Sequence, residues 1–223
     1  MAVIFGSIGT VVDTSELQRE AFNHAFAECG LDWHWARDEY REALRRSGGR
    51  SRIEAEAERR GESVDAREVH AAKSRIYQRM MEVSQIVPRP GVAETIRRAR
   101  EAGLPVAFAT TTSRENVDGV LRAVSDVLGE NAFDFVTDRS MVETGKPDPA
   151  VFDLVVERLG ASRVVAIEDN PDGVRAAAAA GLACLAFPNE NTRGHDFPGA
   201  ARIVEDALDP DEVLGMAVDV EGA

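Results

Sequence analysis

The sequence has few cysteines and no long apolar run. Its two cysteines are Cys29 and Cys184, and neither belongs to a CxxC pair, so we expect neither a disulfide framework nor a structural zinc site. No stretch approaches the roughly 18 apolar residues that a membrane-spanning helix needs. The first residues also lack the basic and apolar segments of a secretion signal. These absences predict a cytoplasmic protein.

Positive charge is also scarce. Lys and Arg number 26 against 39 Asp and Glu, which gives a formal net charge of −13. Without a basic stripe to displace counter-ions, we expect neither general nucleic-acid binding nor attraction to an anionic membrane surface. No amphipathic seam predicts a dimer, so a monomer is the default. With 44% hydrophobic and 29% charged residues, the chain has the composition of an ordinary globular protein.

Short apolar runs alternate along the chain with segments of helical spacing. The runs that have the length and boundaries of buried parallel strands are 2–5, 106–109, 133–136, 164–167 and 183–187. The segments with helical spacing between the later runs are 92–102, 115–128, 150–159 and 173–180. This alternation predicts an α/β fold with a doubly wound, Rossmann-like parallel sheet.

Residues 14–85 have a different character. They are rich in Arg, Glu and Ala, show helical periodicity and contain no strand-like run. Ser15 and Gln18 have the spacing of a capping box on the first helix, and a Ser-Gly-Gly-Arg segment at 47–50 interrupts the helices. We therefore expect an α-helical cap domain inserted into a Rossmann-like core. The cap is 14–85, and the core is 1–13 together with 86–223.

Polar residues gather where the predicted strands end. They follow the first strand (6–10), the second (110–113) and the fourth (168–173), and Lys146 lies in a Gly-Lys-Pro-Asp-Pro segment before a predicted helix. In open α/β sheets, ligands bind at the carboxyl ends of the strands. Because hydroxyls and lysine suit phosphate oxygens and carboxylates suit Mg²⁺, the pattern predicts a site for phosphate and a divalent cation.

Each of these residues also has a structural alternative. The hydroxyls of 110–113 could cap a helix, and Lys146 could be a solvated surface charge. The adjacent carboxylates of Glu168 and Asp169 repel each other unless a cation or hydrogen bonds compensate, which leaves both a metal site and a hydrogen-bonded pair open. Asp13 is expected to cap the first cap helix rather than to replace a nucleophile.

The order of these segments resembles the haloacid dehalogenase superfamily of phosphohydrolases, in its β-phosphoglucomutase-like subgroup with a helical cap. The resemblance extends from Val3 to about Asp196. The cap segments Leu-Asp-Trp-His-Trp (31–35) and Ser-Gly-Gly-Arg-Ser-Arg-Ile (47–53), with Ala-Thr-Thr-Thr-Ser (109–113), are similar to the CbbY-type sugar bisphosphate phosphatases.

The resemblance implies a role for each matching residue. Thr110 matches the hydroxyl that binds the transferring phosphoryl group, with Thr111 and Thr112 beside it, and Lys146 matches the lysine that screens charge there. Glu168 and Asp169 match the acidic pair that binds Mg²⁺. Arg50 and Arg52 fall in the cap loop that touches the distal end of the substrate, where either could hold a second phosphate. The implied ligand is a small sugar phosphate.

The first motif departs from the family pattern. Gly6 stands where the nucleophilic aspartate is expected, Ile8 stands at the acid/base position, and Gln18 occupies the place of a proton-shuttling histidine of the cap. Glycine cannot form an aspartyl-phosphate, and isoleucine cannot donate or accept the proton. The metal loses a ligand too, although Ile8 could still offer its backbone carbonyl to a weakened Mg²⁺ site. Three hypotheses follow: an impaired phosphatase, a pseudophosphatase that binds a phosphorylated metabolite or protein partner, and a scaffold without a ligand.

Aromatic residues and histidines carry weaker signals. We expect Trp33 and Trp35 to pack within the cap rather than to stack on a substrate. None of the four histidines has a metal-like or triad-like neighbour in sequence, so we predict no ligand role for any of them. They are His24, His34, His70 and His195.

Overall fold

The computed structural model describes residues 1–216 and 218–219, and its centre is a parallel sheet. The strands are β1 (Ala2–Phe5), β2 (Val106–Phe108), β3 (Phe135–Val136), β4 (Arg163–Glu168), β5 (Ala183–Ala186) and β6 (Arg202–Ile203). They are parallel in the order β3-β2-β1-β4-β5-β6, and β7 (Val218–Asp219) pairs antiparallel with the start of β4. The predicted Rossmann-like α/β fold is confirmed.

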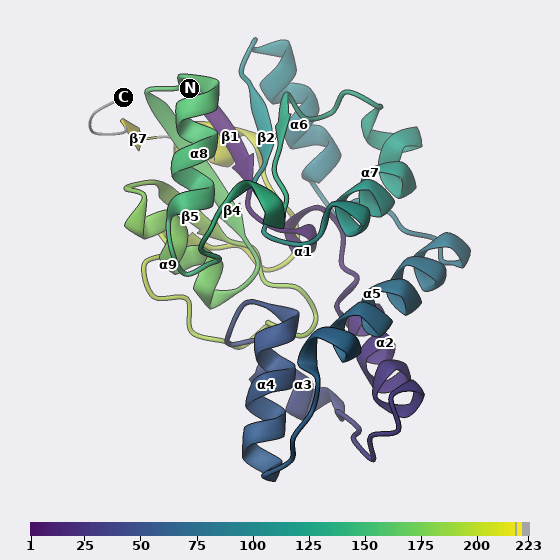
Figure 1. Ribbon diagram of the computed structural model, residues 1–223. Coiled ribbons are helices and arrows are strands. Elements are labelled where there is room, and N and C mark those ends of the chain that lie inside the picture. Colours follow the sequence, from purple (N-terminus) through teal and green to yellow (C-terminus); the bar gives the residue numbers. More distant parts are fainter. Residues whose placement is uncertain (217, 220–223) are drawn as a thin grey trace.

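Helices cover both faces of the sheet because its strands alternate their side chains between two apolar cores. On β1, Val3 and Phe5 belong to one core and Ala2 and Ile4 to the other. The helices that pack on the first core are α6 (Val92–Glu101), α7 (Arg114–Leu128) and α10 (Pro210–Gly215). Those on the second are α8 (Ala150–Leu159) and α9 (Pro171–Ala179), which lie across the sheet from α6 and α7 in Figure 1.

Four helices form a separate group beyond the carboxyl ends of the strands (Figure 1). They are α2 (Ser15–Glu28), α3 (Arg37–Ala43), α4 (Gly49–Arg60) and α5 (Ala66–Val83). Phe22, Phe26 and Trp35 pack against one another in their centre, and Trp33 lies against Phe26. Both tryptophans are buried, which confirms the prediction that they pack within the cap.

The first cap helix begins differently from the prediction. Its N-cap residue is Thr14, so neither Ser15 nor Asp13 holds that position, and the predicted capping box is wrong. Asp13 Oδ1 instead accepts hydrogen bonds from the backbone and hydroxyl of Ser15. The side chain of Gln18 turns away to accept a hydrogen bond from Lys73. The box fails because Gln18 has a stronger, cationic donor available from α5.

The predicted interruption of the cap helices is confirmed but lies earlier than expected, between the end of α3 at Ala43 and the start of α4 at Gly49. Gly48 has a φ of 94°, a backbone conformation that favours glycine, and it is the N-cap residue of α4. Gly49 and Arg50 already lie within that helix. Arg50 and Arg52 are therefore presented from the first turns of a helix rather than from a loop.

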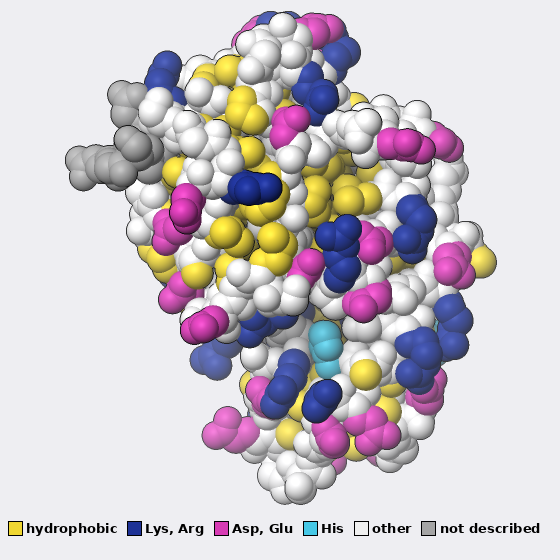
Figure 2. All heavy atoms as spheres, turned by 45° about the horizontal axis from the view of Figure 1, so that its top comes forward, with side chains coloured by type: hydrophobic (Ala, Val, Ile, Leu, Met, Phe, Trp, Pro, Cys, Tyr) yellow, Lys and Arg dark blue, Asp and Glu magenta, His cyan; other side chains and the backbone are white. Residues whose placement is uncertain are grey.

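The five predicted strands and four predicted core helices are all present, with ends that differ by at most two residues. Elements of two to six residues were not predicted: α1 (Ile8–Val11), a 3₁₀ turn at Arg139–Met141, α10, β6 and β7. Such short elements contain too few residues to show a period. In the part of the chain that the structure describes, no helix is long and apolar enough to cross a membrane. The face shown in Figure 2 mixes acidic and basic side chains without a continuous basic area.

Candidate functional site

A cleft of about 730 Å³ lies between the cap helices and the carboxyl ends of the strands. Ten of the residues predicted from the sequence line it: Gly6, Ile8, Gln18, Arg50, Arg52, Thr110, Thr111, Thr112, Lys146 and Asp169. Glu168 does not line the cleft and is fully buried. Residues that are more than 100 positions apart in the sequence therefore meet at one site, as the strand-end argument predicts.

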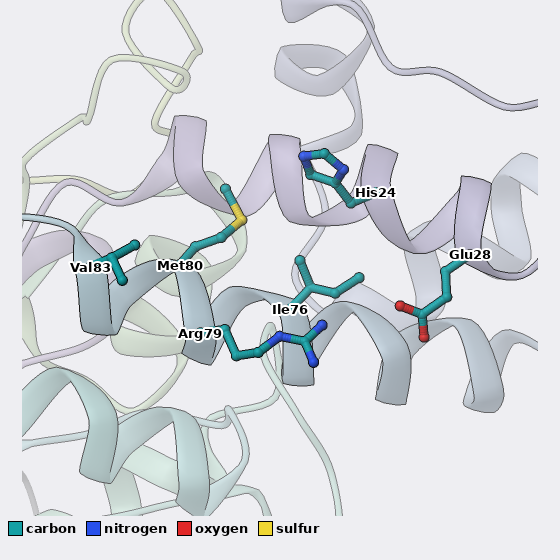
Figure 3. A pocket seen from close by; sticks show the side chains of 6 residues that line it. All are labelled: His24, Glu28, Ile76, Arg79, Met80 and Val83. Carbon is teal, nitrogen blue, oxygen red and sulfur yellow. The ribbon is translucent and has the colours of Figure 1, made fainter.

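A smaller hollow of about 360 Å³ lies on the cap, between α2 and α5. Figure 3 shows the side chains that line it, which come from these two helices alone: His24, Glu28, Ile76, Arg79, Met80 and Val83. No hydroxyl and no strand end contributes to this hollow. The polar chemistry predicted from the sequence belongs to the larger cleft.

The hydroxyl-rich segment after β2 is held by one neighbouring threonine. The hydroxyl of Thr137 accepts a hydrogen bond from Thr110 N and donates one to Thr110 O, both at 2.9 Å. Ser113 is the N-cap residue of α7, yet its side chain makes no capping hydrogen bond, and its buried Oγ has no partner within the described residues. The alternative that these hydroxyls serve to cap the helix is therefore not supported for Ser113.

Lys146 lies at the floor of the cleft and is almost completely buried. Its Nζ donates to the carbonyl oxygen of Gly6, to the carbonyl oxygen of Ala109 at 2.9 Å and to Glu168 Oε1 at 2.5 Å. The alternative of a solvated surface charge is wrong, because 92% of this residue is shielded from solvent. The ammonium group instead connects the ends of three neighbouring strands.

The two carboxylates after β4 have different surroundings. Glu168 is fully buried, and burial raises the pKa of its carboxyl group even though the nearby Lys146 lowers it. Asp169 accepts hydrogen bonds from the Ser7 hydroxyl at 2.7 Å, from the Asn170 amide at 2.9 Å and from the Asn189 amide at 2.6 Å. Both carboxylates therefore have hydrogen-bond partners within the protein.

A magnesium ion does not fit this arrangement of donors. Mg²⁺ requires near-octahedral oxygen ligands, and its protein ligands are usually carboxylates. Among the described residues no group of three or more His, Cys, Asp or Glu side chains could hold a metal. Glu168 is engaged with Lys146, and both oxygens of Asp169 already accept hydrogen bonds. The Mg²⁺ site implied by the resemblance, with Ile8 O as an extra ligand, is therefore not supported by the contacts of these residues.

On the cap side, Gln18 is held by a buried lysine. Lys73 Nζ donates to Gln18 Oε1 at 2.8 Å and lies over the rings of Phe22 and Tyr77. Burial, with a smaller effect of Arg52, lowers the pKa of Lys73 to about 7. This pairing fixes the orientation of the Gln18 amide, which lines the cleft.

His70 also lines the cleft, although no ligand role was predicted for it. Burial, together with the positive charges of Lys73, Arg52 and Arg50, lowers its pKa to about 4. The imidazole is therefore neutral at pH 7 and stands in a cationic part of the cap. The sequence alone does not indicate this position, because His70 lies some 20 residues after Arg50, on another helix.

Hydrogen bonds join the cap directly to the core. The backbone N–H of Ser47 donates to Asp172 Oδ2 at 2.5 Å, and the Ser47 hydroxyl donates to Asn170 Oδ1 at 3.0 Å. Asn170, not Asp172, is the N-cap residue of α9. Asp172 instead holds the cap loop through the hydrogen bond that it accepts from Ser47 N.

Known proteins resemble this chain over most of its length. The profile of the haloacid dehalogenase-like hydrolase family matches residues 1–181. Protein CbbY of Cereibacter sphaeroides is 37% identical over 220 residues, covering 96% of each chain. A phosphorylated carbohydrates phosphatase of Thermotoga maritima is 31% identical over 196 residues, covering 81% of this chain and 82% of that protein.

Solved structures extend the similarity to three dimensions. Crystal structures of CbbY from Rhodobacter sphaeroides contain phosphate in one case and, in a mutant, xylulose-(1,5)bisphosphate in another. Each matches this fold with a TM-score of 0.83 at 37% identity, over 92% of this chain and 94% of that one. Sequence and fold agree over nearly the whole molecule, and the chain belongs to the haloacid dehalogenase-like hydrolase family.

Proposed function

We propose that this protein binds a small phosphorylated sugar in the cleft between cap and core and hydrolyses it at or near the background rate. The observation that carries the proposal is the cleft itself, which retains the hydroxyls, lysine and arginines suited to phosphate but contains no carboxylate at residues 6 and 8. The relatives support the ligand class, since CbbY has been crystallised with phosphate and with a pentose bisphosphate.

The core end of the cleft suits one phosphate group. Thr110 to Ser113 line it at the start of α7, a helix of 15 residues whose N-terminal N–H groups favour an anion. Ser7 lies across from them, after β1, and Lys146 forms the floor. A phosphate in this position receives hydroxyl donors, the helix terminus and a nearby positive charge together.

The cap end of the cleft suits a second anionic group. Arg50 and Arg52 both line it, together with His70. The Nε of Arg52 donates to the carbonyl oxygens of Ala43 and Arg46, both at 3.1 Å, which fixes the plane of its guanidinium group. A sugar with a phosphate at each end spans from the strand ends to this cationic group, which favours a bisphosphate over a monophosphate.

The cleft lacks the side chains that phosphoryl transfer needs at residues 6 and 8. Covalent phosphoryl transfer to the protein needs a nucleophile, and departure of the sugar oxygen needs a proton donor. Gly6 and Ile8 supply neither. Glu168 cannot serve as the nucleophile because it is fully buried and outside the cleft lining. In other covalent enzymes, loss of the nucleophile reduces turnover by roughly 10⁴- to 10⁶-fold.

Phosphate release from a panel of sugar phosphates and bisphosphates tests the catalytic half of this proposal. The native chain is compared with the triple variant Gly6→Asp, Ile8→Asp and Gln18→His, with Mg²⁺ present. We expect a silent native chain and measurable release by the variant, whose preferred substrate then identifies the ligand. Release by the native chain that disappears in Lys146→Ala would instead show a rerouted hydrolase.

Thermal unfolding tests the binding half. Inorganic phosphate or a pentose bisphosphate should raise the melting temperature of the native chain, because a ligand that binds only the folded state stabilises it. Lys146→Ala and Thr110→Val, each measured against its own baseline, should reduce that shift. If no anion shifts the native protein, it does not bind phosphate, and the hypotheses of a protein partner or a scaffold gain support.

The division into domains is part of the same proposal. The cap is residues 14–85, and the core is 1–13 with 86–223. All four cap helices fall within the first range, and Figure 1 shows them together beyond the carboxyl ends of the strands. A monomer stays the prediction for the assembly.

A further inference from the structure

The absence of a side chain at residue 6 is coupled to the position of Glu168. A Cβ atom at Gly6 would lie 2.3 Å from Glu168 Oε1 and 2.6 Å from Glu168 Cδ. Real Cβ atoms do not approach other atoms so closely, so any side chain at residue 6 requires the Glu168 carboxylate to move. The carboxylate of Glu168 thus occupies the space in which a residue-6 side chain would begin.

Gly173 contributes to the same arrangement from the other side. A Cβ atom there would lie 2.1 Å from Glu168 Cδ and 2.3 Å from each carboxylate oxygen. The Glu168 carboxylate therefore lies against two glycines, and each of its oxygens accepts a hydrogen bond. Lys146 Nζ donates to Oε1, and the backbone N–H of Asp169 donates to Oε2 at 3.1 Å.

The negative charges of Glu168 and Asp169 have positive charges close by. A buried carboxylate next to a second one is destabilised unless a positive charge lies nearby. Lys146 supplies that charge to Glu168 through a contact that is shielded from solvent on both sides. Arg89 supplies a second positive charge near Asp169, with its guanidinium anchored on the carbonyl oxygens of Gly9, Phe187 and Pro188.

The Asp169 carboxylate also has close contacts within the protein. A Cβ atom at Gly9 would lie 1.8 Å from Asp169 Oδ2, so Asp169 packs directly on the backbone after β1. Asp169 and Glu54 are the acidic residues among those that line the cleft, and Glu54 forms an ion pair with Arg50 at 2.8 Å. Binding a cation would require breaking these contacts, because every carboxylate oxygen of Glu168 and Asp169 already accepts a hydrogen bond.

We infer that Lys146, rather than a divalent cation, is the permanent counter-ion of the Glu168–Asp169 pair, and that the cleft takes up its phosphorylated ligand without a metal. Gly6 makes this arrangement sterically possible, because the Glu168 carboxylate that pairs with Lys146 occupies the space of a residue-6 side chain. The statement about the ligand rests on the proposed function, whereas the statement about the cation stands independently of it. The negative charge of the ligand is met by the start of α7 and by Arg52 of α4, because Lys146 and Arg50 already have carboxylate partners.

Paramagnetic Mn²⁺ is a suitable probe for the cation, because its resonance signal reports the free ion without any need for activity. Three proteins are titrated: the native chain, Gly6→Asp, and the matched control Gly6→Ala. We expect no saturable uptake by the native chain at millimolar Mn²⁺ and none by Gly6→Ala, which displaces Glu168 without adding a ligand. Gly6→Asp should bind about one equivalent, since it adds a carboxylate at the cleft lining and displaces that of Glu168.

Calorimetric titration of inorganic phosphate and of a pentose bisphosphate, with EDTA and then with MgCl₂, tests the ligand. Equal affinity in the two buffers is the expected result. Saturable Mn²⁺ uptake by the native chain, or ligand binding that requires Mg²⁺, would overturn the inference. A folded Gly6→Asp protein without Mn²⁺ uptake would overturn the role given to Gly6. Absence of ligand binding in both buffers would contradict the proposed function and leave the Mn²⁺ result as it stands.

Discussion

At the scale of single residues, the Lys146–Glu168 pair dominates the electrostatics of the cleft floor. Both side chains are almost fully removed from solvent. Removing one partner of a buried ion pair leaves an uncompensated charge, and this typically lowers the free energy of unfolding by about 3–5 kcal/mol. A single substitution in this pair is therefore expected to lower stability as well as to alter the cleft.

We expect Lys146→Met to be destabilised at neutral pH and less so in acid. Burial already raises the pKa of Glu168 above the ordinary 4.5, and loss of Lys146 removes an effect that lowers it. A carboxyl whose folded-state pKa is raised binds more protons when folded, so its contribution to stability falls as pH rises above 4.5. Denaturant unfolding of native and variant chains between pH 4.5 and 8 measures the difference, which should widen with pH. A constant difference would contradict the pairing.

His70 provides a second residue-level prediction. Its pKa of about 4 reflects burial first and then Lys73, Arg52 and Arg50. A lowered histidine pKa supports the folded state above pH 6.5, and this support is lost as pH falls towards 4. A bound bisphosphate should raise the His70 pKa, because its negative charge offsets the arginines. Imidazole NMR titration with and without ligand measures this, with the exposed His34 signal as a reference that should not respond to the ligand.

Which residues belong to the site could be predicted from the sequence, but which residues they contact could not. Gly6, Ile8 and Lys146 could be assigned to the site because the strand-end rule and the family pattern fix their positions. That Glu168 turns away from the cleft depends on the space left by Gly6 and Gly173, which only packing shows. Lys73 was missed because it lies 55 residues after Gln18.

At the scale of elements, hydrogen bonds join the start of α9 to the loop before α4 and so connect the cap to the core. Asp172 lies in the first turn of α9 and accepts a hydrogen bond from Ser47 N. Ser47 directly precedes the glycine that starts α4, the helix that carries Arg50 and Arg52. The first turn of a core helix thus positions the cap residues that face the ligand.

We expect Asp172→Ala to loosen this loop while the rest of the cap stays ordered. A hydrogen bond to a charged group contributes about 1.5–3 kcal/mol, so amide hydrogen exchange at Ser47 should accelerate by at least about tenfold. Asp153→Ala is the matched control, because Asp153 lies in the first turn of α8 and is exposed. Unchanged exchange at Ser47 in Asp172→Ala would show that the contact does not hold the cap.

Long elements with a clear period were predictable, and short ones were not. The helix at Ala150–Leu159 was predicted with both ends correct, because apolar spacing and Gly160 mark it. The strand predicted at 133–136 is shorter, at Phe135–Val136, because the side chain of Asp134 accepts a hydrogen bond from Val106 N before the strand begins. Propensity cannot reveal such a tertiary contact.

At the scale of the whole molecule, cap and core share one apolar cluster. Phe5 and Phe108 of the sheet belong to the same contiguous set of buried side chains as Phe22 and Tyr77 of the cap. Direct contacts between α5 and α7 join the two parts as well. A shared core of this kind couples the folding of the parts that it connects.

The two tryptophans make this coupling measurable, because Trp33 and Trp35 both lie in the cap and the chain contains no others. Tryptophan fluorescence therefore reports unfolding of the cap, whereas far-UV circular dichroism reports the whole chain. We expect coincident urea midpoints by the two probes, since the cap cannot expose Phe22 and Tyr77 without opening the cluster that also holds Phe5. A bound bisphosphate should shift both midpoints together. A lower fluorescence midpoint would show that the cap unfolds before the core. A bound ligand would then stabilise the attachment of the cap to the core rather than the fold as a whole.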